Sequence, residues 1–138
     1  MSDHPTLTFD VGWDALCSDN RKYLSGSFVL SQAYRSAKEV LANRAWYAAK
    51  KARWERPRGP VLLMVGVTEP DNRRRDFNWA KQIMDSLTAS DAVWWDDSQV
   101  RQMFWYFVGV DRHAPGATIT IVCLPDSSTS TSTSTSEV

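Results

Sequence analysis

The spacing of hydrophobic residues along the chain predicts four β-strands. Apolar and polar residues alternate over residues 6–13, which is typical of a strand with one buried face. The run Val61–Thr68 is apolar almost throughout and predicts a strand that is buried on both faces. Val100–Val110 and Ala117–Leu124 are expected to be two more strands, and the polar residues 111–116 between them predict a hairpin connection.

Two longer segments have the spacing of amphipathic helices. The first is expected to run from Gln32 to Lys51, with Ser31 as its N-cap. The second is expected to run from Phe77 to Ala89. Its expected buried residues are Phe77, Ala80, Met84 and Leu87.

The resulting order is β-α-β-α-β-β, which predicts a small α/β domain with a mixed sheet of about four strands. We expect this domain to occupy residues 1–125. Residues 127–136 are a Ser/Thr alternation without any apolar side chain, so they have nothing to bury. Residues 126–138 are therefore predicted to be a disordered tail.

The formal net charge is zero, but charges of opposite sign are segregated along the chain. Residues 21–81 hold fourteen Lys/Arg and five Asp/Glu, a net charge of +9, and the remaining residues carry −9. Such a distribution can attract a polyanion through one face, and the alternative is two solvated faces of opposite sign. Seven tryptophans are many for 138 residues, and some are expected to form a partner interface or to stack on bases.

The two cysteines, Cys17 and Cys123, have no metal-binding spacing, which favours free thiols in a reducing cytoplasm. No apolar stretch has the length of a membrane span, and we expect no membrane partner. The chain also begins without the basic and apolar segments of a signal peptide.

Acidic residues flank the second predicted helix. The arginine triplet 73–75 runs into Asp76 before this helix, and the Asp96-Asp97 pair follows it. Carboxylates that lie close together repel each other unless they share a proton or a cation, and hard oxygen ligands suit Mg²⁺ or Mn²⁺. Arginines beside them suit a phosphate backbone. The pattern favours metal-assisted phosphodiester chemistry if the two acidic segments meet in space.

The same residues also have structural interpretations. Asp76 at the predicted helix start is a candidate N-cap. Asn78, Lys81 and Asp85 share one face of the predicted helix, and Lys81 with Asp85 would form an ordinary ion pair worth about 0.3–0.5 kcal/mol. Two adjacent acids in a loop, such as Asp96-Asp97, are usually solvated.

Three segments resemble the RusA family of Holliday-junction resolvases, which is common in phages and prophages. Ser18-x-Asn20-x-x-Tyr23 is similar to the family's P-P-S-x-N-x-x-Y loop, and Leu30-Ser31 leads into a helix with Ala33-Tyr34-Arg35, as in the family. The third likeness is the most specific. Residues 70–87 and 95–100 resemble P-D-x-R-R-R-D-x-D-N-x-x-K-x-x-x-D-x-L and the following D-D-[SA]-Q-[VI].

This resemblance implies an α/β homodimer that cuts branched DNA, namely four-way junctions, with two symmetric active sites. The implied activity is that of a Mg²⁺-dependent endonuclease of DNA recombination and repair, encoded by a phage or prophage and acting in the cytoplasm of the bacterial host. Mn²⁺ is an alternative cofactor. The implied catalytic residues are Asp76, Asp97 and Lys81, and the metal ligands are Asp76, Asp97 and Asp96. The expected DNA-binding residues are Arg73, Arg74, Arg75, Asn20, Arg21, Lys22, Tyr23 and Asn78.

The chain departs from the family core at one carboxylate. The family reads R-D-x-D-N where this chain has Arg75-Asp76-Phe77-Asn78, so the second aspartate has no counterpart. Asp96 and Asp85 are the candidate replacements. The alternative function is a weakened or inactive relative that binds branched DNA without cutting it, and a third is a structural phage protein.

Overall fold

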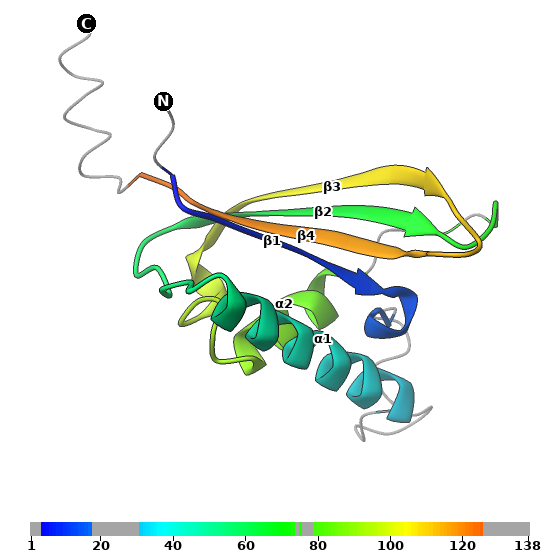
Figure 1. Cartoon of the computed structure of the whole chain (residues 1–138), viewed down its shortest axis with the longest axis horizontal. Helices are drawn as coiled ribbons and strands as arrows, with labels where there is room; N and C mark the ends of the chain where they lie inside the picture. Colours follow the sequence, from blue (N-terminus) through cyan, green and yellow to red (C-terminus); the bar gives the residue numbers. More distant parts are fainter. Residues whose placement is uncertain (1–3, 18–30, 74, 76–78, 126–138) are drawn as a thin grey trace, which may run out of the picture.

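The computed structural model describes residues 4–17, 31–73, 75 and 79–125. Its four strands form one sheet in the order β1-β4-β2-β3, and two helices cover one face of that sheet (Figure 1). The strands are β1 (Thr6–Gly12), β2 (Val61–Glu69), β3 (Val100–Val110) and β4 (Gly116–Cys123). The helices are α1 (Gln32–Lys51) and α2 (Ala80–Ala89), with two short 3-10 helices, η1 (Trp13–Ala15) and η3 (Asp97–Gln99). This confirms the predicted α/β domain with a mixed four-stranded sheet.

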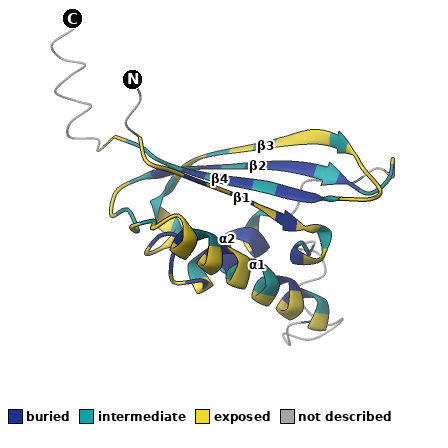
Figure 2. Ribbon diagram, in the orientation of Figure 1, coloured by how far each residue is buried: buried dark blue, intermediate teal, exposed yellow. Residues whose placement is uncertain are grey.

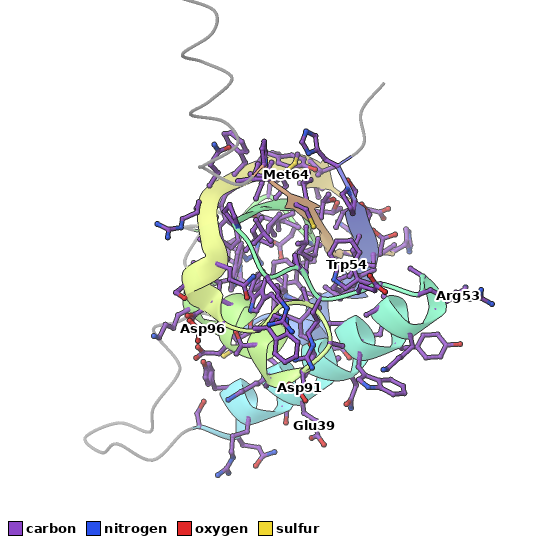
Figure 3. All side chains as sticks on the ribbon, turned by 90° about the vertical axis from the view of Figure 1, so that its left-hand side faces the viewer. Glu39, Arg53, Trp54, Met64, Asp91 and Asp96 are labelled. Carbon is purple, nitrogen blue, oxygen red and sulfur yellow. The ribbon has the colours of Figure 1, made fainter. Side chains whose placement is uncertain are left out.

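Strand β2 is central in the sheet, and its two faces have different surroundings. Val61, Leu63, Val65 and Val67 are completely buried on the helix side. Of the alternate residues, Leu62, Met64 and Thr68 are only half-buried, and Met64 lies on the outer face of the sheet in Figure 3. Burial on both faces was predicted for β2, and it is complete only on the side that the helices cover.

The predicted hairpin between β3 and β4 is wrong, because β2 lies between these two strands. Strand β2 pairs parallel with β3, from Val61↔Val100 to Glu69↔Val110, and antiparallel with β4 on its other edge. Helix α2 returns the chain from the end of β2 to the start of β3, and such a crossover produces a parallel neighbour. The connection to β4 then crosses the end of β2, where the Asp111 N–H donates to the Glu69 carbonyl at 2.8 Å.

The two helices differ in how well the sequence predicts their limits. Helix α1 has the predicted bounds, and the Ser31 hydroxyl caps it by accepting from the Tyr34 N–H at 3.1 Å. Helix α2 begins at Ala80, not at Phe77, and its N-cap is Trp79. Asp76 is therefore not the N-cap of α2, and Asn78 lies outside the described residues.

The buried face of α2 is also different from the predicted one. Gln82, Ile83, Ser86 and Leu87 are buried, whereas Ala80 and Met84 are only partly covered. On this buried face the Gln82 amide hydrogen-bonds to the backbone of Ala15 and Cys17. The expected buried residue Phe77 and the predicted tail 126–138 lie outside the described residues. Neither helix in the described ranges is long and apolar enough to cross a membrane.

Candidate functional site

The predicted site residues that the structure describes lie at opposite ends of the sheet. The segment that begins at Pro70 follows the carboxyl end of β2, while Asp96 and Asp97 precede the start of β3. Because β2 and β3 are parallel and Val61 pairs with Val100, Asp97 lies near the amino end of β2. Nine residues of β2 span roughly 26 Å at about 3.3 Å per residue. Figure 1 shows the two ends on opposite sides of the molecule.

At the carboxyl end of β2, Arg75 lies within an ionic cluster. Its guanidinium is 2.9 Å from a carboxylate oxygen of Asp71 and 3.3 Å from one of Glu69, and its side chain is only 18% exposed. The same guanidinium lies 5.3 Å from the ring of Trp13, which packs edge-on against Trp79. Arg75 therefore fixes the chain to the end of the sheet, and its charge is already balanced.

Asp71 shapes the turn that follows β2. One of its oxygens accepts from the Arg73 N–H at 2.9 Å. The Arg75 guanidinium, and after it the Arg73 N–H, hold the pKa of Asp71 below its usual value of 3.8. The guanidinium of Arg73 is 3.9 Å from an oxygen of Asp71, which is a long distance for an ion pair. The Arg73 side chain is 78% exposed, so a phosphate in solvent can reach it.

Helix α2 carries Lys81 at this same end of the sheet. Lys81 is exposed in the first turn, where the helix dipole disfavours a positive charge. Its neighbour Gln82 is completely buried and accepts from the Cys17 N–H at 3.0 Å while donating to the Ala15 carbonyl at 3.0 Å.

Asp85, a candidate replacement for the missing carboxylate, has a structural partner. The hydroxyl of the buried Tyr34 in α1 donates to an oxygen of Asp85 at 2.5 Å. This contact joins the first turn of α1 to the middle of α2. Asp85 thus takes part in the packing of the two helices.

At the other end of the sheet, Asp96 caps η3. Its carboxylate accepts from the Ser98 N–H at 3.0 Å, and the Ser98 side chain and then its N–H lower the pKa of Asp96. Gln99 completes the turn, because its Oε1 accepts from the N–H groups of Trp95 at 2.8 Å and Asp96 at 3.0 Å. The Asp96 carboxylate therefore stabilises the conformation of this loop.

Asp97 is the carboxylate of this loop that remains available. It is half-buried in the first turn of η3, and within the described part of the chain its carboxylate has no hydrogen-bond or ion-pair partner. A carboxylate that is partly desolvated and unpaired is a suitable ligand for a hard cation. Its donor chemistry fits Mg²⁺ or Mn²⁺.

A single copy of the chain does not assemble a metal site from its described residues. Among these residues, no three His, Cys, Asp or Glu side chains come close enough to hold one ion. Seven predicted site residues lie outside the described ranges, so their positions stay predictions. They are Asp76, Arg74, Asn78, Asn20, Arg21, Lys22 and Tyr23.

The two buried or bridging glutamines are what the sequence analysis missed. Gln82 fixes the segment before residue 18 to α2, and Gln99 fixes the loop that carries Asp97. The sequence carries a signal only for Gln99, which is its place in the D-D-[SA]-Q-[VI] pattern. Periodicity gives no signal for Gln82, because this residue lies opposite the predicted buried face of the helix.

Residues 17–122 match the family model described as Endodeoxyribonuclease RusA. The match includes both acidic segments and all of α1, α2, β2 and β3. The comparison with curated proteins found no match.

Proposed function

Since the chain belongs to the RusA family of endodeoxyribonucleases, we propose that it is a Mg²⁺-dependent enzyme that resolves Holliday junctions as a homodimer. The family supports the nuclease and its branched DNA substrate. The metal dependence, the dimer and the residue roles are our proposal. The observation that carries it is the family match over residues 17–122, together with the unpaired Asp97 carboxylate inside that match.

In this proposal, Asp76 and Asp97 hold the cation, and Asp96 contributes only through the loop that it caps. A bound Mg²⁺ would lower the pKa of a water nucleophile and neutralise charge on the scissile phosphate. Lys81 contacts that phosphate as a point charge from the exposed first turn of α2. Arg73 positions the backbone without reading its sequence.

The separation of the two acidic segments argues for a site shared by two copies. Residues at opposite ends of β2 cannot hold one ion, because carboxylate ligands of Mg²⁺ lie about 2.0–2.1 Å from it. A second copy can supply the missing ligand if the start of its β3, which follows Asp97, lies beside the carboxyl end of β2 in the first copy, at Glu69. An antiparallel arrangement of two β3 strands does this.

Strand β3 has the features of such an interface. It forms one edge of the sheet, is eleven residues long, and its outer side is exposed along most of its length (Figure 2). An exposed apolar edge strand is a template for pairing with another strand. The large exposed apolar residues of β3 are Phe104, Tyr106, Phe107, Val108 and Val110, between 42% and 58% exposed.

A two-fold axis at the middle of β3 pairs the strand with itself. The start of β3 in one subunit, with Asp97, then lies beside Val110 of the partner subunit, which is next to Glu69 in the register of β2 and β3. Each metal site would combine Asp76 of one subunit with the partner's Asp97. Two equivalent sites related by this axis match the two strands that a four-way junction presents.

The alternative is a relative that binds branched DNA with little or no cleavage. The absent second aspartate favours it, and so do the contacts of Asp85 and Asp96, because both carboxylates already hold protein groups. The remaining ligand charge is low, and Mg²⁺ dehydrates reluctantly.

Replacing Asp97 tests the proposal. We expect Asp97→Asn to abolish cleavage of a labelled four-way junction in Mg²⁺, while binding in Ca²⁺ changes less than about threefold, because the basic surface is intact. Asp91→Asn is a matched control, since Asp91 is exposed and paired with Arg56 at 2.8 Å. Cleavage at the wild-type rate by Asp97→Asn would remove Asp97 from the site. A wild-type protein that binds junctions but never cuts them would favour the alternative.

A further inference from the structure

A hollow lies directly beside the loop that carries Asp97. Its volume is about 460 Å³, and it is lined by Arg58, Gly59, Pro60, Ser98, Gln99 and Arg101. These residues come from the loop before β2 and from the start of β3. The hollow therefore lies at the amino end of the parallel strand pair.

Gln99 builds this hollow by joining its two walls. Its amide nitrogen donates to the Pro57 carbonyl at 2.7 Å and to the Gly59 carbonyl at 2.8 Å, while its oxygen holds the backbone of Trp95 and Asp96. The loop that carries Arg58 is thus fixed to the loop that carries Asp97. The hydrogen bonds of Gln99 therefore fix the two walls of the hollow relative to each other.

The charge in the hollow is positive and is not balanced by acids. Arg58 and Arg101 are exposed, and neither has a carboxylate partner in the part of the chain that the structure describes. Arg56 is different, because Asp91 lies 2.8 Å from its guanidinium. Two unbalanced guanidinium groups on the walls of one hollow suit a bidentate anion such as a phosphate.

Trp95 helps to orient these arginines. Its ring is half-exposed, with the Arg56 guanidinium 3.6 Å and the Arg58 guanidinium 5.3 Å from its centre. Stacking on an aromatic face restricts the guanidinium, so less freedom is lost when it binds. Arg58 is held near the hollow before a ligand arrives.

We infer that Arg58 and Arg101 bind a backbone phosphate of the DNA strand that is cut, next to the scissile one. The inference rests on the proposed function, since Ser98 of the hollow directly follows Asp97. The phosphate held here places its neighbour at the Asp97 carboxylate. A DNA strand crossing this end of the sheet therefore contacts the protein through residues outside the arginine triplet 73–75.

The double variant Arg58→Gln/Arg101→Gln tests this site, with binding to a four-way junction measured in Ca²⁺ over a range of salt. Losing two charge-assisted hydrogen-bond donors should weaken binding roughly ten- to hundredfold at low salt. The slope of log K against log salt should fall by roughly 0.9, the contribution of one neutralised phosphate on a duplex arm. Arg53→Gln is the control, because Arg53 is exposed and points away from Asp96 (Figure 3).

A neutral methylphosphonate placed at single positions around the cleavage point identifies the phosphate. We expect one position to weaken binding of the wild-type protein and to have no further effect on the double variant. If the double variant keeps the wild-type slope and the same phosphate map, the inference is wrong while the proposed function stands. If the folded wild-type protein binds no junction DNA at all, the proposed function fails first.

Discussion

At the scale of single residues, two glutamines connect parts of the chain that are far apart in sequence. The Gln82 amide hydrogen-bonds to the backbone of Ala15 and Cys17. The Gln99 amide donates two hydrogen bonds and accepts two, and these join the loops at Pro57 and Trp95. A buried amide costs stability unless its groups are paired, and here they are. Hydrophobic spacing cannot predict such contacts, because it treats a polar residue as exposed.

Gln99→Ala should therefore act on both stability and cleavage. Four hydrogen bonds are lost, at about 0.5–1.5 kcal/mol each, so we expect a loss of about 2–6 kcal/mol in the free energy of unfolding by denaturant. Cleavage should fall more than junction binding, because Asp97 loses its fixed position. Gln32→Ala is the control, since Gln32 is exposed and makes only local helix contacts. An unchanged unfolding midpoint would mean that the two loops are held in another way.

At the scale of elements, the sequence predicts most strands and helices but not their neighbours. The bounds of α1 and β3 were correct, because α1 has clear periodicity and a good N-cap, and β3 is a run of apolar and aromatic residues that ends at a polar connection. The pairing of β4 was wrong, because a short polar connection such as residues 111–116 serves a hairpin and a crossing over one strand equally well. The start of α2 was also wrong, and its N-cap Trp79 packs edge-on against Trp13, a tertiary contact that periodicity cannot reveal.

The outer face of the sheet contains a close contact that can be tested. A Cβ atom on Gly66 would lie 2.5 Å from the ring of Tyr106, the neighbouring residue on β3. Gly66→Ala should therefore displace Tyr106 and cost about 1–3 kcal/mol of unfolding free energy at fixed protein concentration. In a Tyr106→Ala background the same change should cost almost nothing, because the clash is gone.

Gly109 provides the matched glycine for this experiment. A Cβ atom there meets no other atom within 4 Å, so Gly109→Ala should leave stability unchanged or raise it slightly. The comparison is made in the protein that retains Tyr106. If Gly66→Ala lowers the unfolding free energy there no more than Gly109→Ala does, the two strands are not packed as the sheet register indicates.

At the scale of the whole molecule, the proposed site depends on an interface between two copies of the chain. The sequence identifies the acidic residues, since their types and spacing resemble the family core. It does not reveal that Asp97 lies near the amino end of β2 while Asp71 and Arg75 lie at the carboxyl end, because this follows from the parallel pairing of β2 and β3. The separation makes dimerisation a requirement for catalysis in our proposal, and not only a match to DNA symmetry.

Mixing two inactive proteins tests this requirement. In a dimer of one Asp76→Asn subunit and one Asp97→Asn subunit, a shared site leaves one site with both aspartates intact and the other with neither. Random exchange of subunits makes about half of the dimers mixed, so about a quarter of the wild-type number of sites should be restored. Each mixed dimer should nick one strand of a four-way junction and should not resolve it, as gel electrophoresis of end-labelled strands can show.

The edge strand supplies the control for the mixture. Phe107 is 53% exposed on β3, and Phe107→Glu places a charge in the apolar interface that we propose between two β3 strands. We expect this change to give monomers by sedimentation and to prevent any recovery when it is added to both inactive proteins. If instead each site were complete within one subunit, every subunit in the mixture would carry a damaged site. No nicking would then appear, although the wild-type dimer would still cut.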